Sequence, residues 1–563
     1  MLTETHPKTL FVGLDAACWE YVTPLLEAGR LPALQRLMDG GIWGTLHSTL
    51  PALTPTAWAS IVTGKNPGKH GVYDMLQHKP GTYDFRPTSS SARVGTPFWQ
   101  RLNDRGIRVG LVNVPFTYPP DEIDGFVVCG FGAPESAEDV AAPADALNWI
   151  QAHVPDYASR GKLKDLRKTI SLEELLAGER EHQSQQVRIA TDLAHHYDVS
   201  VLVINLMLLD HINHYAQQFD QIEQAICDTD SDLAYLIENF QPDNVLLFSD
   251  HGSRRVQGDF LLHQWLLDGR YISLRERPPA EQKVALHTIL VERSRLQQQS
   301  GWWEKVNRRL LQGAIQSLPP SMTGSLWQSI EKTLPFARQY VRQGEELDYN
   351  RTQLFPGSTY SGNFYVNLTG REPNGVVFPE SLAALQAELA QKLSQLTGPG
   401  SSEPILSGVY TAEQLYHGPA APYAPDLVLD GYNAIWNTKI TSPGLVSSPV
   451  LADYFLAQHG DAGWHSKDGL FVFTGPAIRQ GAADWDGRVM DLPATLLYQY
   501  DIPIPEDFDG RVLLDAFTAD FRGQQPIQHQ TGDPETALPF ESGYSNDEAA
   551  DVLEHLRSLG YVE

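Results

Sequence analysis

Short hydrophobic runs alternate with longer amphipathic stretches along most of the chain. The runs are β-branched or continuously apolar, and they cover residues 9–14, 108–114, 125–130, 199–206, 244–249 and 469–475. Near-continuous apolar strands that alternate with helical patterns are typical of a mostly parallel sheet with helices on both faces. We therefore predict an α/β fold, in which binding sites lie beyond the carboxyl ends of the strands.

Two segments depart from this pattern. Residues 281–342 contain no clear strand and hold nine lysines and arginines against four acidic residues, so we expect a helical insertion there. Such a segment is a solvated decoration, a cap over the substrate, or a basic surface that attracts anions. After about residue 517 the chain becomes polar, and it closes with an amphipathic helix for which Ser545 is the expected N-cap.

The net charge of the chain bears on which classes of ligand it binds. The 563 residues carry a formal charge of −27, whereas a protein that binds nucleic acid typically presents a basic surface. A phosphate-ester substrate is compatible with this charge, because bound cations can invert the local field. We therefore expect no nucleic-acid binding, and phosphate chemistry stays open.

The number and spacing of the cysteines, together with the lack of long apolar runs, indicate the cellular compartment. Cys18, Cys129 and Cys227 are scattered and form no CxxC motif, which favours a reducing compartment. The N-terminus lacks a basic region followed by an apolar core, and no apolar run approaches ~18 residues. These features predict a cytoplasmic protein without a transmembrane segment.

Residues that commonly bind metals stand at the ends of the predicted strands. Two of them are spaced i and i+4, which places them on one face if their segment is helical. Each one alone has an ordinary explanation, such as an aspartate that caps a helix. Because these strand ends plausibly share one rim, we expect the side chains to meet. The six residues are Asp15, Asp210, His214, Asp250, His251 and His465.

This set of ligands favours a particular chemistry. Mixed carboxylate and imidazole ligands suit zinc, manganese or iron better than calcium or magnesium. Three aspartates and three histidines can give two neighbouring metal ions three protein ligands each. Two metals ~3.5–4 Å apart hold both the attacking and the leaving oxygen of an in-line displacement. The set therefore predicts a phosphoryl-transfer site with two divalent metal ions.

The stretch from Thr49 to Asp74 contains a motif that resembles a phosphate-binding loop. Its "GKNPGKH" segment is one residue too short for that motif, and His70 replaces the required serine or threonine. Thr54 instead precedes Pro55 and a helix-like run, so it is either an N-cap or a nucleophile at a helix N-terminus. A threonine hydroxyl needs a metal or a base to activate it, and the predicted metal set favours the nucleophile.

These motifs together resemble a known family. The chain is similar to the alkaline phosphatase superfamily and, within it, to the type I phosphodiesterase/nucleotide pyrophosphatase family. The similarity is carried by "GLDAA", "TPTAWASIVTGKNPGKHGVYD", "DHINH", "SDHG" and "H…DGLFVFTGP". It implies a mostly parallel α/β sheet covered by helices and a metal-dependent hydrolase of phosphate esters.

The resemblance also implies a role for each residue of the set. Thr54 would be the nucleophile that becomes transiently phosphorylated or nucleotidylated. Asp15, Asp250 and His251 would hold, together with the Thr54 oxygen, the metal that activates it.

The second metal would activate the hydrolytic water. The resemblance assigns this metal to Asp210, His214 and His465, and the pair in this family is usually zinc. His211, inside the same "DHINH" motif, is then outside the ligand set, because the spacing selects His214.

The chain departs from the family in the substrate contacts. Family members carry an asparagine three residues after the nucleophile, and here that position is Ala57. Asn113 is a candidate substitute donor to phosphate, the alternative being a loop cap. Lys65, like the nearby Lys69 and His70, is a candidate phosphate contact, the alternative being a solvated turn.

We therefore predict a phosphodiesterase that acts through a covalent phosphothreonine on a small phosphate ester or nucleotide-like substrate. The alternatives are a phosphomonoesterase, phosphonate hydrolase or phosphomutase on the same site, or a pseudoenzyme that binds phosphorylated ligands without turnover. The expected domains are a discontinuous catalytic domain over 1–277 and 346–530, a helical insertion over 278–345 and a tail over 531–563. The sequence leaves the oligomeric state open.

Overall fold

The computed structural model shows the alternation of strands and helices that the hydrophobic pattern predicts. It describes residues 6–559 except 136, 156, 158–171, 276–346, 358–361, 432–435, 440–449, 453, 458–462, 484 and 535–542. The predicted insertion at 278–345 therefore lies outside the described residues. None of the described helices is long and apolar enough to cross a membrane.

A ten-stranded sheet forms the centre of the molecule. Its order is β21-β2-β20-β9-β1-β8-β5-β6-β7, with β22 beside β2. The strands are β1 (Thr9–Leu14), β2 (Gly41–His47), β5 (Val109–Val114), β6 (Gly125–Cys129), β7 (Ala141–Ala142), β8 (Val201–Leu206), β9 (Asn244–Phe248), β20 (Asp468–Thr474), β21 (Gly481–Ala482) and β22 (Gly487–Arg488). All six strands predicted from the hydrophobic runs are present in it.

The direction of the strands decides where the functional residues meet. Strands β9, β1, β8, β5 and β6 are parallel, which confirms the mostly parallel sheet. Strand β20 is antiparallel to both β2 and β9. The amino end of β20 therefore lies at the same edge as the carboxyl ends of β9, β1 and β8.

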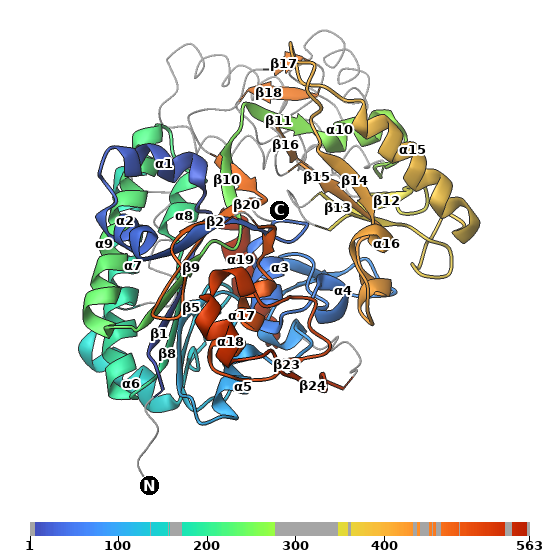
Figure 1. Cartoon of the computed structure of the whole chain (residues 1–563). Coiled ribbons are helices and arrows are strands. Elements are labelled where there is room, and N and C mark those ends of the chain that lie inside the picture. The colour runs from blue at the N-terminus through green and yellow to red at the C-terminus, as the bar shows by residue number, and fades with distance from the viewer. Residues whose placement is uncertain are drawn as a thin grey trace.

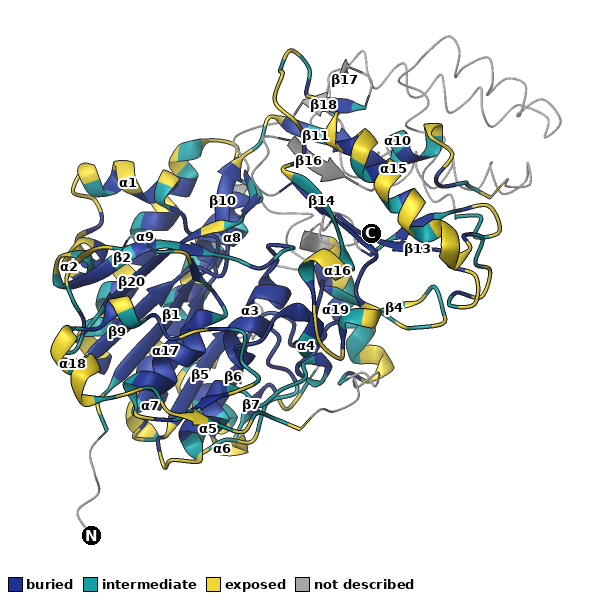
Figure 2. Ribbon diagram, turned by 45° about the vertical axis from the view of Figure 1, so that its right-hand side comes forward, coloured by how far each residue is buried: buried dark blue, intermediate teal, exposed yellow. Residues whose placement is uncertain are grey.

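Helices cover both faces of this sheet (Figure 1). One face carries α1 (Trp19–Glu27), α2 (Pro32–Gly40), α6 (Ala144–His153), α7 (Leu172–His196), α8 (Leu208–Asn213) and α9 (Phe219–Phe240). The other face carries α3 (Thr54–Thr63), α5 (Phe98–Asn103), α17 (Asp491–Gln499), α18 (Ala519–Gln524) and α19 (Asn546–Leu559). Two separate hydrophobic clusters fill the two interfaces, so the strands are buried on both sides, as Figure 2 shows.

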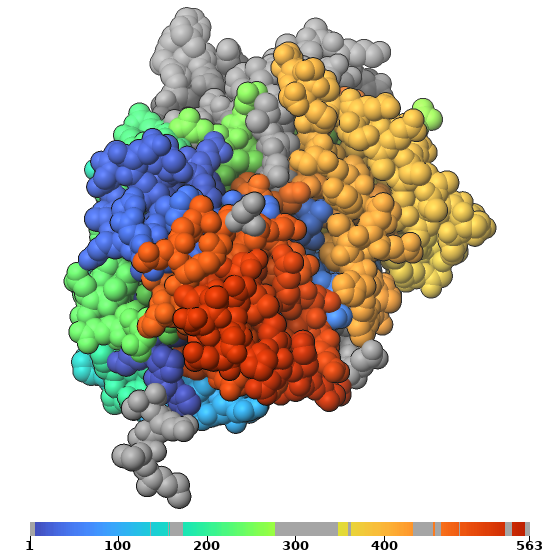
Figure 3. Space-filling model, viewed as in Figure 1, coloured from blue at the N-terminus to red at the C-terminus, as the bar shows by residue number. Residues whose placement is uncertain are grey.

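A small lobe stands beside the sheet, at the upper right of Figure 1. Its core packs two short sheets against α10 (Leu262–Asp268) and α15 (Leu382–Ser394), and α16 (Ala412–Leu415) lies next to it. The two sheets are β12 (Leu354–Pro356), β13 (Asn363–Val366), β15 (Leu427–Asp430) and β14 (Gly408–Thr411), then β16 (Trp436–Lys439), β11 (Gly258–Leu261), β18 (Phe455–Ala457) and β17 (Val450–Ala452). Figure 3 shows this lobe, in yellow and orange, packed beside the red C-terminal segment.

Three small pairs of strands complete the described structure. They are the ribbon of β10 (Gly252–Arg255) and β19 (Gly463–Ser466), the hairpin of β3 (Leu76–His78) and β4 (Phe85–Pro87), and the pair β23 (Ile504–Pro505) and β24 (His529–Gln530). The short helix α4 (Pro67–His70) follows α3 closely. The ribbon β10–β19 matters most for function, because it begins directly after Asp250 and His251 and carries His465.

The C-terminal helix α19 lies within the predicted tail 531–563. Its side chains Val552 and Leu556 are buried in the core on the α3 face of the sheet. Ser545 is positioned as predicted, since its hydroxyl accepts a hydrogen bond from the Glu548 amide and its own amide donates to the Glu548 carboxylate. The division of the chain into domains stays a prediction.

Candidate active site at the carboxyl edge of the sheet

Three aspartates come together at the carboxyl edge of the sheet. Asp15 directly follows β1, Asp250 follows β9 by one residue, and Asp210 lies on α8 after β8. All three side chains are buried. Their proximity follows from the sheet order, because β9, β1 and β8 are adjacent parallel strands.

The first ligand group surrounds His251. Its Nε2 lies 3.5 Å from Asp15 Oδ1 and 3.6 Å from Asp250 Oδ2. Asp15, Asp250 and His251 form one of two groups whose ligand atoms are close enough to bind a single metal ion. These are the three side chains predicted for the metal beside Thr54.

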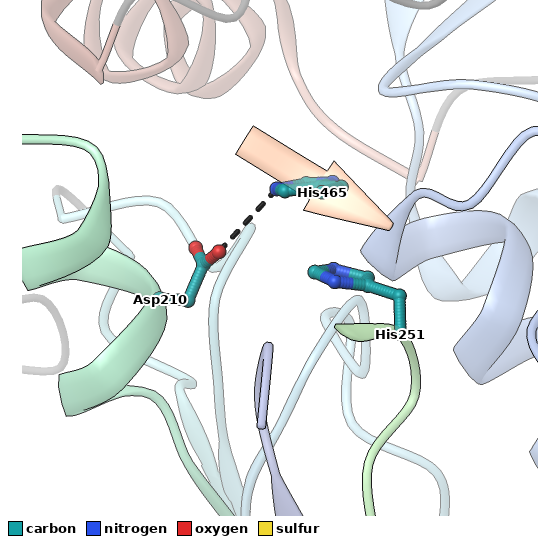
Figure 4. A group of neighbouring side chains, drawn as sticks. All are labelled: Asp210, His251 and His465. Carbon is teal, nitrogen blue, oxygen red and sulfur yellow. Dashed lines mark ion pairs between the residues drawn. The ribbon is translucent and has the colours of Figure 1, made fainter. Parts of the chain in front are cut away.

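The second ligand group surrounds Asp210. Its Oδ1 lies 3.3 Å from the Nε2 of both His214 and His465, and these two nitrogens are 3.2 Å apart. The rings of His465 and His251 stack 3.9 Å apart, and Figure 4 shows them facing each other beside Asp210. The second group whose ligand atoms are close enough for a single metal ion is Asp210, His251 and His465, so it contains His251 in place of the predicted His214, which adjoins it.

Backbone carbonyls hold both central imidazole rings. His465 Nδ1 lies 3.0 Å from the Ala52 carbonyl oxygen, and His251 Nδ1 lies 3.2 Å from that of Gly252. A carbonyl only accepts, so each Nδ1 carries the proton and donates it. Each Nε2 lone pair then faces the carboxylates, which is the orientation that metal-binding histidines adopt.

Thr54 adjoins the first group. Its Oγ1 lies 3.2 Å from His251 Nε2, and the side chain is buried. Thr54 is the first residue of α3, whose N-cap is Leu53, and no side chain caps this helix. The N-cap interpretation of Thr54 is therefore wrong, and its hydroxyl contacts the ligand cluster instead.

The electrostatics of the cluster favour a bound cation. Burial, with the charge of Asp210, raises the pKa of Asp250 to about 8, and burial with the charge of Asp250 raises the pKa of Asp15. Burial also opposes the charged form of Asp210, but His214 and His465 outweigh it and lower its pKa. Burial lowers the pKa of His465 to about 3.

Several oxygens of the cluster lack a hydrogen-bond partner. Asp15 Oδ1 and both carboxylate oxygens of Asp250 accept no hydrogen bond from any residue that the structure describes. Buried carboxylates are normally paired or coordinate metals. The residues therefore fit divalent cations held by mixed oxygen and nitrogen ligands.

Sequence reasoning missed Asn205. This buried residue of β8 donates from Nδ2 to Asp15 Oδ2 at 2.9 Å and so fixes the carboxylate. Its side chain lies against Gly13 of β1, where a Cβ would come within 2.4 Å of Asn205 Oδ1. The available signal was an asparagine inside the otherwise apolar run "VLVINL".

Asn113 lies near the cluster, but its contacts differ from both interpretations. It belongs to β5, is buried, and adopts a positive φ of 55°. Its Nδ2 donates to the Asn205 carbonyl oxygen at 2.8 Å, which braces the neighbouring strand. The loop-cap interpretation is wrong, and a phosphate contact of Asn113 stays a prediction.

Lys65 forms ion pairs with two aspartates. Its Nζ lies 2.5 Å from Asp507 Oδ2 and 2.8 Å from Asp533 Oδ2. The side chain is buried, and so is His70, so the solvated-turn interpretation is wrong. These ion pairs give Lys65 a structural role, and its contact with phosphate stays a prediction.

The fold is alkaline-phosphatase-like, and the activity class follows from the family. The chain belongs to the type I phosphodiesterase/nucleotide pyrophosphatase family, because the family's sequence model matches residues 9–313, more than half of the chain. This confirms the resemblance to that family, and the protein is a phosphoester hydrolase. No curated protein matches the sequence.

Solved structures share the fold. Phosphonoacetate hydrolase from Sinorhizobium meliloti 1021, in complex with phosphonoacetate, aligns with a TM-score of 0.50 at 15% identity, over 86% of this chain and 94% of that chain. A variant of alkaline phosphatase PafA aligns with a TM-score of 0.53 at 12% identity, over 91% and 99% of the two chains. At these identities the similarity concerns the fold.

Proposed function

We propose that the protein is a phosphodiesterase in which Thr54 is the nucleophile. The observation that carries this proposal is the position of the Thr54 hydroxyl. It lies at the first position of α3, is not used for capping, and contacts His251 at the centre of a buried cluster of metal-type ligands. The free amides at a helix N-terminus and the helix dipole also favour a phosphate at this point.

Two divalent metal ions fit the two ligand groups, and zinc suits the mixed ligands best. Asp15, Asp250, His251 and the Thr54 oxygen would hold one ion, and Asp210, His214 and His465 would hold the other. When bound, such ions lower the pKa of a coordinated hydroxyl or water and neutralise charge that develops on phosphoryl oxygens.

The reaction then has two balanced steps. Thr54 Oγ1 loses its proton to solvent and attacks phosphorus, so that the Oγ1–P bond forms and the bond to the leaving alcohol breaks. The departing oxygen takes up a proton. A water next attacks the phosphothreonine, the Oγ1–P bond breaks, and Thr54 regains its proton as the phosphate monoester leaves.

Charge supports a diester rather than a monoester. A monoester is a dianion at neutral pH and needs more positive charge than a monoanionic diester. The two lysines after α3 do not supply it freely, because Lys65 pairs with Asp507 and Asp533, and Lys69 pairs with Asp509.

Hydrolysis of bis(4-nitrophenyl) phosphate and of 4-nitrophenyl phosphate, each with and without a chelator, tests the proposal. The wild type should prefer the diester, and the chelator should abolish turnover. Preference for the monoester, or for phosphonoacetate, would favour the alternative activities on the same site. Binding of phosphate without turnover of any substrate would indicate a pseudoenzyme.

The nucleophile is tested by Thr54→Ala and Thr54→Ser. Loss of the hydroxyl should lower kcat/KM by several orders of magnitude, because a reacting group is removed. Thr54→Ser should keep partial activity and, after an acid quench during turnover, carry a phosphoryl adduct detectable by mass spectrometry. Near-normal hydrolysis by the alanine variant, with its metal content unchanged, would refute the assignment.

A further inference from the structure

Asn213 is a buried polar residue that the proposed chemistry leaves without a role. It is the last residue of α8, directly before His214 and three residues after Asp210. The residue is fully buried. Neither Nδ2 nor Oδ1 has a hydrogen-bond partner among the residues that the structure describes. A buried amide with neither group paired is rare and destabilising, so it calls for a specific explanation.

The amide lies against the strand that carries His465. A Cβ at Gly463 would come within 2.3 Å of Asn213 Oδ1, so only a glycine leaves room for the amide there. Gly463 and His465 are two residues apart on β19 and therefore face the same side of the ribbon. Asn213 thus approaches the face of β19 from which His465 reaches the ligand cluster.

Asn213 and Thr54 stand on different flanks of this cluster. Thr54 contacts His251, whose ring stacks on His465, and His465 in turn contacts His214. Asn213 belongs to the His214 flank by its position in the chain and by its contact with β19. In an in-line displacement the leaving oxygen departs on the side opposite the nucleophile. With Thr54 as the nucleophile of the proposed function, the leaving oxygen belongs on the side of the second ligand group, and Asn213 directly precedes its His214.

We infer that Asn213 binds the leaving-group oxygen of the substrate through its Nδ2 donor. This inference rests on the proposed function, since it needs Thr54 as the nucleophile. The negative charge on the departing oxygen grows as the P–O bond breaks, so a donor aimed at it stabilises the transition state more than the ground state. Asn213 is then a catalytic residue of the second ligand group, supplied by the "DHINH" motif rather than by the position of Ala57.

The test is the dependence of the rate on the leaving group. Methyl 4-nitrophenyl phosphate has a good leaving group, and methyl phenyl phosphate has a poor one that depends more on stabilisation of the oxygen. Asn213→Leu, which keeps the branched shape of the side chain and removes the donor, should lower kcat/KM for the phenyl ester about tenfold more than for the nitrophenyl ester. The metal content of the variant should match that of the wild type.

A matched control and a second variant make the result decisive. Asn244→Leu removes another buried asparagine, which lies on β9 and donates to Thr9, and it should leave the ratio of the two rates unchanged. If Asn213→Leu does not fold, the smaller Asn213→Ala, which also removes the donor, should shift the same ratio. In chelator, Asn213→Leu should also melt at or above the wild-type temperature, because it removes an unpaired buried amide.

An unchanged ratio in a folded variant that binds metal would overturn the inference and give Asn213 a packing role. The proposed function would survive that result, because the wild type would still hydrolyse both diesters. If the wild type hydrolyses neither diester, the proposed function fails and the inference fails with it. The two failures are therefore distinguishable in one set of measurements.

Discussion

Two groups of partly or fully buried aspartates lie in this molecule, and their surroundings are opposite. Asp15 and Asp250 lie at the candidate active site, where desolvation and the charge of a neighbouring aspartate raise their pKa values. Asp509 lies beside α4 and Asp533 beside α5, where cations and amides lower their pKa values despite partial burial. In the first group the charged form of the carboxylates is destabilised, whereas in the second group the partners stabilise the charged form.

The difference is visible in the contacts of each carboxylate. Asp533 accepts from Lys65, Arg101 and the Thr96 amide and hydroxyl. By contrast, neither oxygen of Asp250 accepts a hydrogen bond from the described part of the chain. Buried charges that form ion pairs connect segments of the fold. Buried charges without a partner are typical of sites where a ligand supplies the opposite charge. Asp509 and Asp533 with their cationic partners therefore form a structural network, whereas Asp15 and Asp250 belong to a candidate binding site.

The largest effect should come from Asp250→Asn. This change keeps the shape of the side chain but removes a proposed metal ligand, so we expect loss of bound metal and a fall in kcat/KM of about a thousandfold or more. In chelator the variant should melt no lower than the wild type, because it removes a repelled buried carboxylate. Retention of both metals, measured by elemental analysis, would contradict the ligand assignment.

Asp533→Ala should lower stability rather than metal binding or activity, the opposite of Asp250→Asn. It removes the acidic partner of the buried Arg101, while Lys65 keeps Asp507, and losing charge-assisted hydrogen bonds of this kind costs about 1.5–3 kcal/mol of unfolding free energy. Chemical denaturation should show this loss, while metal content and kcat of the folded fraction stay near wild type. If activity fell and stability did not, Asp533 would belong to the functional group rather than to the network.

A smaller effect is expected for Asn205→Leu. Asn205 holds Asp15 through one hydrogen bond, and residues that orient metal ligands typically contribute about 10–100-fold to metal affinity. Titration with zinc should show weaker binding by that factor, with kcat largely restored at saturating metal. Zinc affinity equal to wild type would mean that the other ligands position Asp15 without Asn205.

The effect that is smallest at pH 7 concerns His70, a buried residue near Lys65 and Asp509. Its Nε2 contacts the Ser60 hydroxyl, and burial lowers its pKa to about 3. The pKa of histidine in the unfolded chain is near 6.5. Between pH 6.5 and pH 3 the unfolded chain therefore binds a proton at His70 that the folded chain does not. Stability should therefore fall as the pH drops through this window, by up to about 1.4 kcal/mol per pH unit. His70→Gln should lack this part of the slope in denaturation series from pH 7 to 4, and an unchanged slope would place a proton on folded His70.

The ligand cluster and the sheet were predictable because both follow local rules. Apolar runs mark the strands, and residues such as Asp15 and Asp250 directly follow them. The structural network was not predictable, because Lys65 and Asp533 are 468 residues apart and each stands in a polar stretch that looks solvated. Asn205 and Asn213 were also missed, since their importance depends on which buried atoms they do or do not contact. Pairing across the fold is information that spacing along the chain does not carry.

The place of β20 has a consequence for how this protein is made. Strand β20 is the neighbour that joins β2 to β9, and it leaves the ribosome more than 400 residues after β2. Until then β2 has no place in the sheet, β9 presents an open edge, and His465 has not been synthesised. Open strand edges invite association between chains. A fragment ending at residue 313, where the family match stops, would keep that edge open permanently, so expression of this fragment alone should yield aggregates rather than a smaller enzyme.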